Sequence, residues 1–179
     1  MSEILYTETQ WFRKTPWLFF VVPFWLFMVV TSVYGIYSQI VLKISFGSNP
    51  MSDTMLIVTT FMSVTFVTAL LILFLIGRME IIVSDRGLLY RYIPFINKFR
   101  IIKPIEIRFY ETRKYHPIKE FWGWGIRYDF KNKINCYNVR GNLGLYIELK
   151  NGQKILFGSQ NPHKFKTAID KLTGVNKNK

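Results

Sequence analysis

The sequence predicts a membrane helical hairpin followed by an all-β domain that is closed by one C-terminal α-helix. Two long stretches, residues 17–42 and 55–77, contain no charged residue. After Gly77 the apolar residues alternate with polar ones, which is typical of half-buried strands. Near the C-terminus the period changes again to that of a helix, and these three observations define the fold class.

The stretch 55–77 is predicted to be a membrane-spanning helix. A helix needs about 20 mostly apolar residues to cross the hydrocarbon core of a bilayer. The serine and threonine residues in this stretch are tolerated there, because their hydroxyl groups can bond to the preceding turn. Gly77 and Arg78 end the apolar stretch.

Residues 17–42 are predicted to form the first spanning helix, with Pro23 near its start, where a proline costs little. A signal peptide is the alternative. It is disfavoured because acidic residues precede an apolar stretch that is too long, and no small-residue cleavage site follows. Residues 1–16 form a polar start in which aromatic residues bracket Arg13 and Lys14, as expected at a membrane interface.

Residues 43–54 are predicted to be a short loop between two antiparallel spans, because Gly47, Asn49 and Pro50 break helices. Positive residues favour the cytoplasmic side of a membrane. Arg13, Lys14 and the basic region after Gly77 therefore predict that both termini are cytoplasmic and that the loop faces outward.

The positive charge of the chain follows the second apolar stretch. Of 24 Lys and Arg residues, 21 follow Gly77, as do 8 of 11 acidic residues, so this part carries the whole net charge of +13. Such a charge favours an anionic partner, whether lipid headgroups, an acidic protein or nucleic acid. Solubility and the positive-inside bias explain it equally well. Arg13, Lys14 and Arg78 are the candidate membrane-surface residues, and nucleic acid is not expected because nothing indicates base reading.

The region from residue 78 to residue 174 is predicted to hold about seven or eight antiparallel strands and a final helix. A tight turn at 84–87 joins the first two strands, and Asn151-Gly152 is a strong hairpin signal. The expected strands are 79–84, 87–93, 98–103, 105–115, 124–130, 134–139, 145–150 and 154–157.

The final helix is predicted from its start signal, its apolar stripe and its stop signal. Asn161 is the expected N-cap, and Pro162 occupies the first helical position. Gly174 ends the helix, and residues 175–179 are expected to be a flexible tail. The apolar stripe consists of Phe165, Ala168, Ile169 and Leu172. About seven strands closed by one helix is the plan of a pleckstrin-homology (PH)-like barrel, with the helix covering one opening.

Several local motifs resemble a family of small bacterial membrane proteins that have two predicted spans and a bacterial PH-like domain. The resemblance covers the two-span layout and roughly residues 78–173. It implies a fold and a location in the bacterial cytoplasmic (inner) membrane, but no reaction. The motifs are residues 123–128, residues 137–139 with Gly141 and Gly144, residues 147–149, Asn151-Gly152, and residues 158–160 with Pro162.

Trp122, Trp124 and Arg127 form the candidate partner-binding cluster, in the densest aromatic stretch of the chain. Tryptophan and arginine are frequent hot-spot residues in protein interfaces. A structural role is the favoured alternative: the neighbouring glycines permit a bulge, while the tryptophans cover a barrel edge or lie in the membrane interface.

No catalytic or metal-binding set is expected. His116 and His163 lie far apart in the sequence without ligand spacing, and Cys136 sits in a strand pattern as a small residue. The turn at 84–87 is too short for the lipid-headgroup pocket of eukaryotic PH domains. The sequence therefore predicts a non-enzymatic membrane-anchored adaptor without a cofactor, which contacts anionic lipid non-specifically and binds a protein partner or a second copy. A structural subunit of a larger membrane complex is the alternative.

Overall fold

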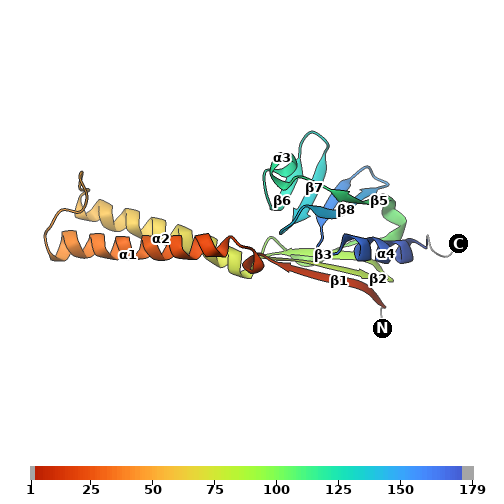
Figure 1. Ribbon diagram of the computed structural model, residues 1–179, viewed down its shortest axis with the longest axis horizontal. Coiled ribbons are helices and arrows are strands. Elements are labelled where there is room, and N and C mark those ends of the chain that lie inside the picture. The colour runs from red at the N-terminus through yellow and green to blue at the C-terminus, as the bar shows by residue number, and fades with distance from the viewer. Residues whose placement is uncertain (1–2, 175–179) are drawn as a thin grey trace. The chain divides into compact units, whose positions relative to one another are not determined.

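The computed structural model describes residues 3–174, which form two compact units (Figure 1). One unit is helical and runs from Arg13 to Leu75. The other, here called the β unit, combines the chain up to Phe12 with the chain from Ile76 onward. The predicted flexible tail, residues 175–179, lies outside the described residues.

The helical unit consists of two antiparallel helices, α1 (Leu18–Ile36) and α2 (Asp53–Ile76). A short 3₁₀ turn, η1 (Phe12–Lys14), precedes α1, and a π-helical segment, η2 (Tyr37–Val41), extends it. Both helices are long and apolar enough to cross a membrane. The Trp25 Nε1–H donates to Thr68 Oγ1 at 2.9 Å and joins the two helices.

The first sheet of the β unit has four antiparallel strands in the order β1-β2-β3-β4. These strands are β1 (Ile4–Trp11), β2 (Arg78–Ser84), β3 (Gly87–Ile93) and β4 (Ile96–Ile102). The strand β1 is absent from the sequence prediction, in which residues 1–16 are only a polar start. It pairs with β2 along its length, with Trp11 opposite Arg78.

The second sheet has five strands in the order β5-β8-β9-β7-β6. The strands β7 and β9 pair in parallel, whereas the other neighbours are antiparallel. A 3₁₀ turn, η3 (Pro104–Glu106), leads into this sheet, and the short helix α3 (Pro117–Phe121) lies between its first two strands in the sequence. The strands are β5 (Ile107–Lys114), β6 (Gly125–Asp129), β7 (Ile134–Asn138), β8 (Leu143–Leu149) and β9 (Lys154–Gly158).

The C-terminal helix α4 (Pro162–Thr173) contributes to the main core together with both sheets. Phe165 and Ile169 are fully buried, and Leu172 packs against the same core. Pro162 occupies the first turn and Gly174 adopts a left-handed conformation after the last one, as predicted. Asn161 stands at the N-cap position, but its side chain makes no capping hydrogen bond.

The predicted closed barrel is not formed: the β unit has two separate sheets of four and five strands. The all-β character and the C-terminal helix are confirmed, and each of the eight predicted strand positions holds a strand. The purely antiparallel pairing is wrong, and a ninth strand, β1, lies outside the region in which strands were predicted. The differences are the N-terminal strand β1 and the parallel β7–β9 pair, both of which depend on contacts distant in sequence.

Candidate functional site

The chain leaves the β unit and returns to it at two positions that are bonded to each other. The Phe12 N–H donates to the Gly77 carbonyl oxygen at 3.0 Å, next to the Trp11–Arg78 pair. Residues 13–76 are therefore an insertion between two paired strands of one sheet. We call Phe12 and Gly77 the exit pair.

Arg78, a predicted membrane-surface residue, is held in a network on the outer face of the first sheet. Its guanidinium pairs with Glu80 at 2.6 Å and lies 4.7 Å from the centre of the Trp11 ring. Arg91 on β3 pairs with the other carboxylate oxygen of Glu80 at 2.7 Å. One carboxylate thus offsets part of the charge of two arginines. This pairing reduces the electrostatic attraction between Arg78 and an anionic lipid headgroup.

The two arginines also set the protonation of Glu80. Partial burial by itself raises the pKa of this carboxyl group, but the hydrogen bonds from Arg78 and Arg91 outweigh it and hold the pKa below its ordinary value. The other two predicted membrane-surface residues, Arg13 and Lys14, lie together in η1 with exposed side chains.

Trp124 and Arg127, two of the three candidate partner-binding residues, are in contact. The Arg127 Nε–H donates to the Trp124 carbonyl oxygen at 3.1 Å, and the Trp124 indole N–H donates to the Gly141 carbonyl oxygen at 3.1 Å. Trp122, the third candidate, stands apart from this contact. It ends α3 in a left-handed conformation with 87% of its surface exposed. We call residues 122–125 the Trp122 loop.

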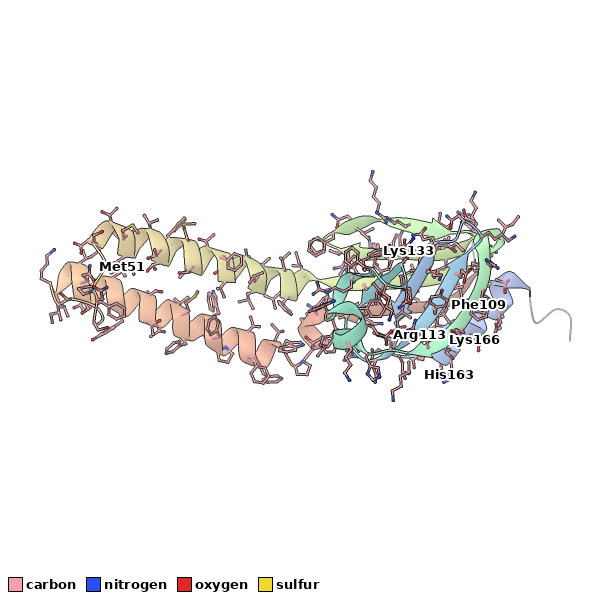
Figure 2. The ribbon with its side chains drawn as sticks, turned by 90° about the horizontal axis from the view of Figure 1, so that it is seen from above. Met51, Phe109, Arg113, Lys133, His163 and Lys166 are labelled. Atoms are coloured by element: carbon pink, nitrogen blue, oxygen red, sulfur yellow. The ribbon has the colours of Figure 1, made fainter. Side chains whose placement is uncertain are left out.

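A groove of about 340 Å³ separates α4 from the start of β1, and we call it the α4–β1 groove. Leu5 and Tyr6 of β1 line it on one side, and Ala168 of α4 lines it on the other. Side chains from α4 complete the lining: the cationic Lys164 and Lys171, two helical turns apart, together with Thr167 and with His163, which Figure 2 labels on this helix.

The cations of this groove are available for an external anion. Among residues 3–174, neither Lys164 nor Lys171 is paired with a carboxylate. The nearby Asp170 is already engaged, because it pairs with Lys166 at 3.1 Å and accepts a 2.6 Å hydrogen bond from the Tyr110 hydroxyl. An apolar floor with an unpaired cationic rim suits an amphipathic, negatively charged ligand.

The Glu8 carboxylate fixes the β1 side of the groove. One of its oxygens accepts hydrogen bonds from the Tyr6 and Ser159 hydroxyls, and the other accepts from the Gln10 side chain and the Gln160 backbone N–H. Burial, and then the bond to Glu8, raise the pKa of the Tyr6 hydroxyl, so this group stays protonated as a donor. These bonds tie β1 to the connection between β9 and α4.

The remaining potentially reactive side chains, Cys136 and His116, do not lie in the α4–β1 groove. Cys136 is fully buried with Tyr115 and Phe121 in a small second core beside the second sheet, and burial raises the pKa of its thiol. His116 precedes α3. Within the described residues, no group of three or more His, Cys, Asp or Glu side chains is placed to hold a metal ion.

The α4–β1 groove was not predicted, because the sequence pattern indicates no strand in residues 4–11, which form β1. A partial signal is present in α4, where Lys164, Thr167 and Lys171 recur at helical spacing on its polar face. Comparison with known proteins adds nothing to these observations, since no protein-family model, curated protein or solved structure matches the chain.

Proposed function

We propose that this protein is a non-enzymatic binding module, anchored in a membrane by its helical hairpin, that holds an acidic segment of a partner protein in the α4–β1 groove. The groove is the observation that carries the proposal. Its floor is apolar, and its rim presents Lys164 and Lys171 without paired carboxylates among the described residues. Charge complementarity therefore favours a partner segment that combines acidic and apolar side chains.

The membrane placement rests on the two apolar helices and on the exit pair. The proposal places α1 and α2 across the bacterial cytoplasmic membrane, with both termini and the β unit in the cytoplasm. Strands β1 and β2 pair, so the chain must leave and re-enter the β unit on one side of the membrane. Two antiparallel spans satisfy that requirement, and the positive charge after Gly77 favours the cytoplasmic side.

The β unit is proposed to be a divergent PH-like domain of the small bacterial membrane protein family that the sequence resembles. The supporting features are consecutive strands in two sheets and a C-terminal helix buried against both. The turn between β2 and β3 is short, so the proposal includes no stereospecific lipid-headgroup pocket and limits lipid contact to non-specific attraction.

A photo-crosslinking experiment tests the groove. A benzoylphenylalanine residue at position 167, whose native threonine is exposed in the middle of the groove, should capture a partner in native membranes. Mass spectrometry of the adduct should locate an acidic segment. The double variant Lys164→Glu, Lys171→Glu should abolish capture, because reversed charges on the rim repel that segment.

The matched control is Lys131→Glu with Lys133→Glu, which makes the same charge change at exposed positions between β6 and β7. Figure 2 shows Lys133 well away from α4. Capture should survive in this control. Capture that is equally weakened in both double variants, or that yields no acidic segment, would refute the groove as the binding site.

A structural subunit of a larger membrane complex remains the second candidate. It is favoured by the exposed apolar side chains that cover nearly all of α1 and α2, where Gly35 and Leu56 are the only buried residues. Partner helices as well as lipid can cover such a surface. A partner that is lost when residues 13–76 are exchanged for unrelated spans, but is retained by the Lys164→Glu, Lys171→Glu variant, would favour this candidate.

A further inference from the structure

Trp122 combines an unfavourable backbone conformation with an almost fully exposed side chain. Its φ of +59° lies in the left-handed region, which costs an L-residue about 1–2 kcal/mol and is usually occupied by glycine at helix ends. The residue is 87% exposed, so packing within the described residues does not explain the choice of tryptophan. Ile118, whose carbonyl accepts the Trp122 N–H, is also 67% exposed.

The Trp122 loop is held by two hydrogen bonds from the glycines that follow Trp122. The Gly123 N–H donates to the Pro117 carbonyl oxygen at 2.9 Å, and the Gly125 N–H donates to the Asn138 side-chain oxygen at 2.8 Å. Asn138 itself is fully buried. The loop therefore presents Trp122 in a fixed conformation, which lowers the entropy lost when the ring binds.

The loop lies at the end of the β unit where the chain leaves it. The Phe12 ring contacts the Tyr92 ring edge-on, with centroids 6.2 Å apart. The Tyr92 hydroxyl donates to the Asn138 carbonyl oxygen at 2.9 Å, and Asn138 bonds to Gly125 of the loop. Three contacts within the β unit thus connect the exit pair to the Trp122 loop.

We infer that the Trp122 loop is an interfacial anchor, in which the Trp122 indole inserts among the lipid headgroups of the leaflet that the hairpin enters. The inference rests on the proposed membrane placement of α1 and α2. The chain passes from Ile76 to Arg78 with only Gly77 between helix and strand, so residues near the exit pair stay close to the bilayer surface. Tryptophan prefers the headgroup region, where its ring is partly apolar and its N–H remains solvated.

The anchor carries charges that suit this position. Lys119 precedes the loop and Arg127 follows it, and both side chains are exposed. Cations next to an interfacial aromatic ring attract anionic headgroups, an effect that falls off within a Debye length of about 8–10 Å. The anchor gives the β unit a second attachment to the bilayer besides the hairpin, and so restricts its tilt.

Environment-sensitive fluorescence in proteoliposomes tests the anchor with the full chain. Three variants, Trp122→Cys, Phe130→Cys and Phe66→Cys, are labelled with nitrobenzoxadiazole, while the buried Cys136 stays unlabelled. Phe130 is the matched control, because it is an 85% exposed aromatic residue at the opposite end of β6. Phe66 lies within α2 and reports on the hairpin. The vesicles contain phosphatidylglycerol and phosphatidylethanolamine, with quenchers attached either near the headgroup or deep in the acyl chain.

The label at position 122 should show blue-shifted emission and quenching by the headgroup-level quencher, whereas the label at position 130 should show neither. The label at position 66 should be quenched from the acyl-chain depth. Quenching at 66 with a solvent-exposed label at 122 would overturn the anchor and leave the membrane placement intact. An unquenched label at 66 would overturn the membrane placement and the anchor with it. A blue shift at 122 without lipid quenching would show contact with another copy of the chain, and would overturn the anchor.

Discussion

Phe165→Ala should destabilise the β unit strongly, because Phe165 joins α4 to both sheets. Its side chain is fully buried, its ring stacks on Tyr6 with centroids 5.3 Å apart, and it lies 6.3 Å from the Phe157 ring. Truncation of a buried phenylalanine to alanine costs about 3–5 kcal/mol through lost burial and the cavity that remains. For a domain of roughly 100 residues, this loss corresponds to a fall in melting temperature on the order of 15 °C.

Thermal unfolding of the full chain in detergent, followed by near-ultraviolet circular dichroism, measures the effect. Phe130→Ala is the matched control, since it removes the same side chain from an 85% exposed position and should leave the transition almost unchanged. A transition for Phe165→Ala that lies as close to the wild type as that of Phe130→Ala would refute the reasoning. In that case α4 would not stabilise the β unit.

Three further predictions concern topology, pH and independent folding. In intact cells, a membrane-impermeant thiol reagent should label Ser48→Cys but should label Gln153→Cys only after permeabilisation, with the buried Cys136 as background; the reverse pattern would reject the proposed orientation. The stability that ionised Glu80 contributes is present above the unfolded pKa and is lost as the pH falls through the depressed folded pKa. Urea unfolding at neutral pH and at about pH 3 should therefore show a smaller acid-induced loss of unfolding free energy for Glu80→Gln than for wild type. Equal losses would exclude Glu80 as a cause of acid destabilisation. Replacing residues 13–76 by Asn-Gly should join β1 to β2 through a two-residue turn and give a soluble β unit; aggregation or missing β-sheet signal in circular dichroism would show that folding needs the hairpin.

The sequence predicts those elements whose patterns are local. Strands such as β2, β3 and β8 alternate buried residues with more exposed ones between turn signals, and α4 carries a one-sided apolar stripe between Pro162 and Gly174. The contact between Trp124 and Arg127 is likewise local, because they lie three positions apart in the sequence. Such features need no knowledge of the rest of the chain.

The strand β1 has no such pattern, since its inward side chains at Glu8 and Gln10 are polar. Glu8 and the Gln10 side-chain N–H bond to groups that lie about 150 positions further along the chain, Ser159 and the Gly158 carbonyl oxygen. Local periodicity cannot indicate those partners. The α4–β1 groove depends on the same strand, and the pairing of Arg78 with Glu80 and Arg91 depends on the register of β2 and β3. These features become visible only when the sheets are assembled.

The exit pair has a consequence for how the protein is made. A ribosome completes β1 first, then all of residues 13–76, and only afterwards the strand that pairs with it. During this interval β1 is an unpaired strand, which is prone to pair with other chains. If a single helix inserted across the bilayer, β1 and β2 would end on opposite sides and the first sheet would lack its edge strand. Under the proposed membrane placement, the first sheet can therefore be completed only after the whole hairpin has been inserted, and a chain with a half-inserted hairpin keeps an exposed edge that proteases and chaperones can recognise.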